Sequence, residues 1–273
     1  GSDDDLTDEL FELYRSLLGA AAFALLTRAD VAVFIVALQR MSSKAKVIHI
    51  KRLNVVVRFM KRNPRKIHYE RLRGPVTLIS VSDSAFKKED ESGHALKGGL
   101  FILAETAYRT GGTARGHLLD YVCSRERHVT RSTFGAELFG ACDSADTAMH
   151  LVCLLDQIQC GSMTPAKART LREEGGWSVE VELALDAFSV FAAVTASQVK
   201  IPAEKALLSH VQYLRELLDR KILSRLLWLD TRDMWSDGLT KGAVEREPPR
   251  SAGRRASPLP PARTRRACKQ PAR

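Results

Sequence analysis

The sequence predicts an α/β domain in which a mixed β-sheet is flanked by helices, with a helical segment before it. Three β-rich runs follow one another closely, helical spacing of apolar residues recurs before and after them, and two later strands alternate with helices. The predicted order is three strands, a helix, a strand, helices, a strand and a helix. This order alone fits several α/β folds.

The N-terminal segment, residues 1–72, is predicted to be helical from residue 7 onward. Apolar side chains recur at spacings of three and four in three successive stretches. Thr7, followed by two acidic residues, suits a helix start, and Asn63-Pro64 ends the third stretch. Basic residues of that third stretch lie mostly off its apolar stripe, which is typical of a solvated face and also compatible with nucleic-acid contact.

Short β-rich runs begin after Gly74-Pro75. Short polar connections join them, which predicts an antiparallel meander. These strands are Val76–Val81, which ends just before Asp83, then Leu100–Ala104, then His117–Ser124.

A long apolar helix and two single strands follow the meander. The predicted elements are a helix from Thr133 to Leu155 capped by Ser132 or Thr133, a polar loop from Gly161 to Gly176, a strand Trp177–Leu185, a helix Phe188–Thr195, a helix Glu204–Leu218 opened by Pro202, a strand Leu226–Leu229 and a helix Arg232–Lys241.

Composition narrows the class of protein. With 45% hydrophobic residues among 273, the chain can bury a core, but no apolar run reaches the roughly 18 residues that a membrane-spanning helix needs. Five cysteines without a C-x-x-C pair favour a reducing, intracellular setting over a zinc site or disulfide framework. Cys142 and Cys153 fall on the apolar side of the long predicted helix and are interpreted as core residues.

The net charge of +10 is concentrated at one end of the chain. Residues 243–273 hold nine basic and two acidic residues, so this stretch carries +7 and the remainder of the chain carries +3. Rich in Pro, Arg and Ala, the stretch is predicted to be a disordered tail. It either binds phosphates non-specifically or is a solvated linker-like end.

Four acidic residues stand out by their positions. Asp83 and Asp186 end predicted strands, Glu137 lies in the first turns of the long helix, and Asp237 lies on the last helix. If the first and fourth strands are neighbours, these acids converge, and like charges so close require a cation. Hard oxygen ligands suit Mg²⁺ or Mn²⁺, and two such ions can organise attack on a phosphodiester. Taken singly, each acid also fits an ordinary role at a turn, a helix cap or the surface.

Several segments resemble the Pol polyprotein of copia-type LTR retrotransposons, at the end of its reverse transcriptase and in its ribonuclease H domain. The similarity spans roughly residues 10–242, and its most specific parts are the first and the last of the matching segments. These are Tyr14–Gly19 (YRSLLG) with Thr27–Ala32, Val81–Phe86, Ser124–Leu138, Leu183–Val190, Leu214–Glu216 and Trp228–Lys241.

The resemblance implies a ribonuclease H-like fold over residues 73–242, following a reverse-transcriptase connection remnant at 1–72. It implies that Asp83, Glu137, Asp186 and Asp237 are the catalytic residues and hold two Mg²⁺ ions, with Mn²⁺ as a substitute. The expected activity is hydrolytic cleavage of the RNA strand of an RNA–DNA hybrid by an endonuclease during reverse transcription.

The resemblance also implies partners and a location. The expected partners are an RNA–DNA hybrid and the remainder of the polyprotein, with no membrane, in cytoplasmic virus-like particles or the nucleus. Departures from the family pattern at Phe86, Phe134 and Ala187 remove no metal ligand but leave an alternative open. In that alternative, the chain is a catalytically dead or domesticated remnant that binds nucleic acid.

Overall fold

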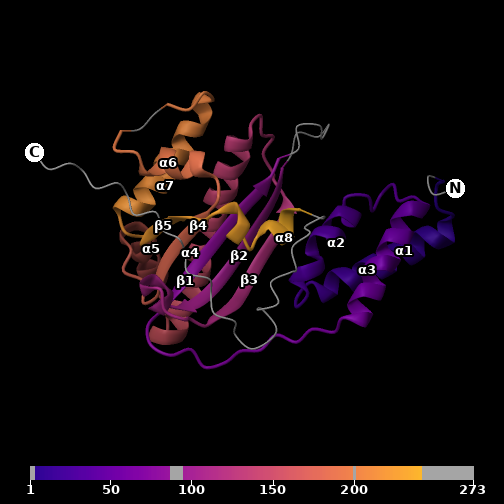
Figure 1. The fold of residues 1–273 in the computed structure, drawn as a ribbon, viewed down its shortest axis with the longest axis horizontal. Coiled ribbons are helices and arrows are strands. Elements are labelled where there is room, and N and C mark those ends of the chain that lie inside the picture. Colours follow the sequence, from indigo (N-terminus) through magenta and orange to yellow (C-terminus); the bar gives the residue numbers. More distant parts are fainter. Residues whose placement is uncertain (1–3, 87–94, 199–200, 242–273) are drawn as a thin grey trace, which may run out of the picture.

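A central five-stranded sheet with helices packed on both faces forms the main body of the chain (Figure 1). The computed structural model describes residues 4–86, 95–198 and 201–241, together with all their side chains except that of Arg232. The predicted tail and Cys268 lie outside the described residues. The strands are β1 (Val76–Ala85), β2 (Leu96–Glu105), β3 (Gly116–Arg125), β4 (Glu180–Leu185) and β5 (Arg225–Trp228).

The strand order is β3-β2-β1-β4-β5. Strands β1, β2 and β3 form an antiparallel meander, whereas β4 pairs parallel with β1 and β5 pairs parallel with β4. The predicted meander is therefore confirmed, and the first and fourth strands are neighbours, which is the condition for the acids to converge. Three antiparallel strands continued by two parallel ones, with a long helix between the two sets, make this a ribonuclease H-like fold.

One face of the sheet is covered by helices that follow the meander (Figure 1). The longest, α4, lies across β1 and β4, and its apolar side chains form the largest buried cluster together with Leu78, Phe101 and Leu183. The helices on this face are α4 (Thr133–Cys160), α6 (Phe188–Thr195) and α7 (Leu208–Asp219), with the 3₁₀ turn η3 (Lys205–Leu207) before α7; α5 (Pro165–Glu174) follows α4 in the chain.

The opposite face carries a much shorter helix, α8, and beyond it the N-terminal helices (Figure 1). A second buried cluster joins Ile79 and Val81 of β1 to Leu239 of α8 and Ala32 of α2. The N-terminal helices also share a third cluster of their own, centred on Tyr14, Ile35 and Leu53. The elements are α1 (Asp8–Ala24), η1 (Ala29–Val31), α2 (Ala32–Gln39), α3 (Val47–Arg62), η2 (Thr106–Thr110), η4 (Thr231–Asp233) and α8 (Asp237–Thr240).

Two of the predicted elements are wrong. The stretch expected to be a polar loop contains α5, which starts with Pro165 after the N-cap Thr164 and buries only Leu171. Helix α5 has too few apolar residues to show the recurrence at spacings of three and four from which the other helices were predicted. The continuous final helix is instead the turn η4 followed by the single-turn α8.

Helix α4 is long and apolar enough by composition to cross a membrane, although half of its most apolar window is buried within the fold. It runs to Cys160, beyond the predicted end, and its predicted cap is confirmed, because the Ser132 hydroxyl accepts a hydrogen bond from the Gly135 amide. Cys142 is buried as predicted, whereas Cys153 is only half-buried and contacts Met163. The apolar character of α4 is that of a core helix of an α/β domain.

Candidate active site

Asp83 lies near the end of β1 on the face that α8 covers. Its side chain is 2% exposed, and the Thr240 hydroxyl of α8 donates a hydrogen bond to it. Burial raises the pKa of Asp83 to about 6, with smaller contributions from the negative charges of Asp186 and Asp237, while Thr240 and the Lys241 ammonium oppose the shift. A carboxylate in this setting is costly to ionise without a further cation.

Glu137 reaches the same place from the first turns of α4. The helix can approach β1 closely because Gly140, one turn later, leaves room for the Ser82 and Ser84 hydroxyl groups. The Glu137 carboxylate accepts a hydrogen bond from the Ser84 amide. Even so, burial, reinforced by the charges of Asp83 and Asp186, raises its pKa to about 9.

Asp186 directly follows β4. The parallel register pairs Ser82 with Leu185, so the two following residues, Asp83 and Asp186, emerge side by side at the same edge of the sheet. The indole Nε1 of Trp228 on β5 donates to the main-chain oxygen of Asp186 over 3.0 Å, which fixes the backbone beyond the strand. Burial is again the main cause that raises the pKa of Asp186.

The structure brings three of the four predicted acids together. Asp83, Glu137 and Asp186 each offer a carboxylate oxygen, and these oxygens lie within 4.8 Å of one another. Asp237 is a neighbour of this cluster rather than a member: its charge acts on Asp83 and Asp186, while its own carboxylate lies 2.5 Å from the Lys241 Nζ.

Thr240 and Lys241 are site residues whose roles the sequence did not reveal. Lys241 interacts with Asp83, Asp186 and Asp237, and although burial opposes its charge, the hydrogen bond to Asp237 and these three charges raise its pKa. The available signal was the i, i+4 spacing of Asp237 and Lys241 on a helix, which brings their side chains together. One ammonium beside several carboxylates leaves the site with net negative charge when they are ionised.

The donor set fits a divalent metal ion. Three carboxylates from three separate elements converge, all are buried or half-buried, and the pKa of each is raised by burial and by neighbouring acids. Oxygen-only ligands of this kind suit Mg²⁺ or Mn²⁺ rather than softer metals.

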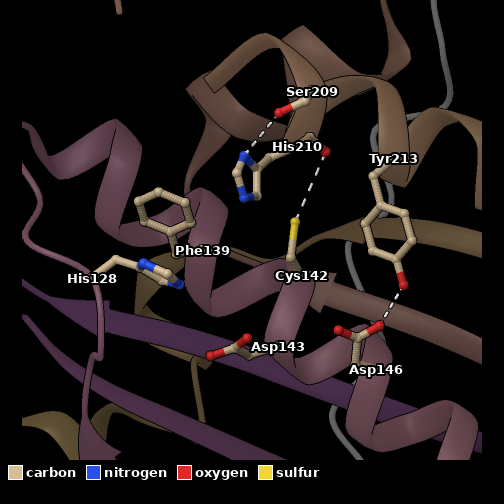
Figure 2. A pocket seen from close by; sticks show the side chains of 8 residues that line it. All are labelled: His128, Phe139, Cys142, Asp143, Asp146, Ser209, His210 and Tyr213. Carbon is tan, nitrogen blue, oxygen red and sulfur yellow. Dashed lines mark hydrogen bonds between the residues drawn. The ribbon is translucent and has the colours of Figure 1, made fainter. Parts of the chain in front are cut away.

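A pocket of about 300 Å³ lies elsewhere, between α4 and α7 (Figure 2). His128 and His210 line it, with ring centroids 5.1 and 4.7 Å from that of Phe139. Asp146, which also lines the pocket, accepts a hydrogen bond from the Tyr213 hydroxyl (Figure 2). None of the four predicted acids lines this pocket, so its two histidines do not belong to the carboxylate cluster.

Comparison with known proteins finds a distant structural likeness. No protein-family model matches the chain, and neither does any curated protein. Among solved structures, the chain is similar to the N-terminal RNase H domain of Rv2228c from Mycobacterium tuberculosis, solved as a fusion protein with maltose binding protein. The match has 16% identity and a TM-score of 0.35, and covers 62% of this chain and 93% of that chain. The ribonuclease H-like fold of this chain is therefore defined by its own strand order and register.

Proposed function

We propose that this chain is a ribonuclease H-type endonuclease that hydrolyses the RNA strand of an RNA–DNA hybrid. The observation that carries the proposal is the convergence of Asp83, Glu137 and Asp186 at one edge of the sheet. Buried carboxylates without a functional cation would destabilise the fold, so their assembly favours a metal-binding role. The Pol-like segments described above support the choice of substrate.

Within this proposal, Asp83, Glu137 and Asp186 hold the metal, and Asp237 completes the ligand set. When bound, a pair of Mg²⁺ or Mn²⁺ ions supplies an activated water and stabilises the leaving 3′ oxygen. The chain's own contribution is geometric: β1, β4 and α4 fix the three carboxylates before substrate arrives. Recognition of the hybrid is expected through backbone shape and 2′-hydroxyl groups rather than through base edges.

The proposal extends to the origin and organisation of the chain. It is a copia-type Pol segment, with a reverse-transcriptase connection remnant at 1–72, the nuclease domain at 73–242 and a basic tail at 243–273. Its biological role is to remove template RNA after reverse transcription. It acts with the remainder of the polyprotein as its partner, in cytoplasmic virus-like particles or the nucleus. The Tyr14–Gly19 and Trp228–Lys241 segments are what support this assignment.

A gel assay with an end-labelled RNA–DNA hybrid and a magnesium titration tests the activity. Asp83→Asn and Asp186→Asn are expected to abolish metal-dependent cleavage, because each removes a charged ligand while preserving shape. Asp219→Asn, which changes an exposed acid at the end of α7, serves as the matched control and is expected to cleave like the wild type. Circular dichroism checks that all variants are folded.

Two outcomes would count against the proposal. Equal cleavage by the wild type and by Asp83→Asn would show that the product comes from another site or a contaminant. Salt-sensitive binding of the hybrid with no metal-dependent product would favour the alternative of a nucleic-acid-binding remnant without catalysis.

A further inference from the structure

Helix α8, which carries Asp237 and Thr240, is a single turn of four residues. A helix of this length has no stability of its own, because the nucleation cost is not recovered by later hydrogen bonds. Its position therefore depends on the elements that contact it, which are β1, β2 and β3 on one side and η1 and α2 on the other.

The sheet side of this contact is tight. A Cβ atom added to Gly98 of β2 would lie 2.8 Å from Thr240 Cγ2 and 3.0 Å from Leu239 Cβ, so α8 rests directly on the backbone of the strand. The Cys123 thiol of β3 donates to the Leu239 oxygen over 3.1 Å. The sheet thus limits how far α8 can move inward.

The other side is supplied by the N-terminal helices. Ala32, the first residue of α2, is fully buried in the same cluster as Met234 and Leu239, and Leu25 packs against that cluster. The Tyr121 hydroxyl of β3 donates to the main-chain oxygen of Leu25, which ties the end of α1 to the sheet.

We propose that the N-terminal helices hold α8 in place through Ala32, Leu25 and the hydrogen bond from Tyr121, a set of contacts that we call the clamp. These three are then positioning residues for Asp237 and Lys241. The clamp supports the metal site from a part of the chain that contributes no ligand to it. This inference rests on the proposed function in one respect: it takes the cluster of Asp83, Glu137 and Asp186 to be a divalent-cation site. Displacement of the helices by a partner would then weaken metal binding without touching a carboxylate.

A size-matched pair of substitutions in the full-length chain tests the clamp. Ala32→Leu inserts bulk between α2 and α8, whereas Ala21→Leu inserts the same bulk inside the cluster of the N-terminal helices. Hydrogen exchange of residues 231–241 is expected to accelerate in Ala32→Leu alone, and the Mn²⁺ dissociation constant to rise by about tenfold, as for other losses of support around a metal site. Equal effects of the two variants, or no local change in Ala32→Leu, would overturn the proposal.

A milder pair covers the case in which added bulk prevents folding. Tyr121→Phe removes the hydroxyl that ties α1 to the sheet, and Tyr14→Phe removes a hydroxyl that donates to Leu38 over 2.8 Å within the N-terminal helices. Only Tyr121→Phe is expected to speed exchange in residues 231–241 and weaken Mn²⁺ binding. Unchanged exchange in Tyr121→Phe would contradict the clamp.

The two proposals fail differently. Hydrogen exchange is measured without metal, so it tests the clamp even if the wild type binds no Mn²⁺. Absence of Mn²⁺ binding by the wild type would instead refute the metal site and the proposed function. Mn²⁺ binding of equal strength in wild type and Ala32→Leu would refute the clamp alone.

Discussion

Lys241→Gln removes an ammonium group that interacts with Asp83, Asp186 and Asp237. In the metal-free chain, that ammonium offsets part of the repulsion among the acids. We therefore expect the variant to be less stable without metal and to bind Mn²⁺ more tightly, since the lysine and the metal compete for the same negative charges.

The magnitude follows from the exposure of the pair. Two unit charges about 4 Å apart attract by about 1 kcal/mol in water and about 4 kcal/mol at an effective dielectric constant of about 20. The Lys241 side chain is 43% exposed and that of Asp237 only 8%, so solvent screening places the loss near the lower figure. A loss of about 1–2 kcal/mol corresponds to a melting temperature about 2–8 °C lower for a chain of this size.

Thermal unfolding monitored by circular dichroism, with and without Mn²⁺, measures both effects. The deficit of Lys241→Gln is expected near pH 7 and should shrink near pH 4, because Asp83, whose pKa is raised to about 6, is protonated there and no longer attracts the ammonium. In Mn²⁺ the deficit should largely disappear. Lys205→Gln, an exposed lysine in η3, is the control and should melt like the wild type.

The reasoning would be refuted by a variant whose metal-free melting temperature and Mn²⁺ affinity both equal those of the wild type. It would also be refuted by a deficit of the same size near pH 4, because the effect would then not arise from the carboxylate cluster.

Three further predictions concern the cluster and its support. The pKa values of Asp83 and Glu137 in the folded chain are raised to about 6 and about 9, so the folded state holds these protons more tightly than the unfolded state does. The metal-free melting temperature should therefore fall as the pH rises from about 4 to 9. Saturating Mn²⁺ should remove this trend. Gly140→Ala should cost about 1–3 kcal/mol in urea unfolding because its methyl group meets the Ser84 hydroxyl, and adding Ser84→Ala should recover part of the loss. Glu182→Gln should cost about 1–3 kcal/mol in the same assay, because it removes the buried charge that pairs with the half-buried Arg109 and leaves that arginine with the more exposed Glu180. A cost near zero would contradict this.

Much of the fold was predictable because its strands carry strong local signals. The runs around Val76–Val81 and Leu100–Ala104 are rich in β-branched or apolar residues, and both are buried strands. The strand predicted from Trp177 begins only at Glu180, because the preceding Gly175 and Gly176 both have positive φ and the chain is still turning there.

The site was predictable to the extent that strand ends determine it. Asp83 and Asp186 lie side by side because parallel neighbouring strands end at the same edge, which follows from sheet geometry once the strand order is known. The place of Asp237 depends instead on tertiary packing of a one-turn helix. Local sequence does not determine such packing. It therefore did not predict that Asp237 forms an ion pair with Lys241 and stands beside the cluster of the other three acids.

The parallel pairing of β1 with β4 has a consequence for the order of folding. The two strands are separated by the rest of the meander and by α4 and α5, so Asp83 and Asp186 meet only after a long loop of chain has closed. Contacts of such wide sequence separation form late and slowly. Repulsion between Asp83 and Asp186 is therefore absent while the antiparallel hairpins and α4 assemble, and it appears only when β4 pairs with β1. Charge at this centre should consequently speed unfolding more than it slows folding.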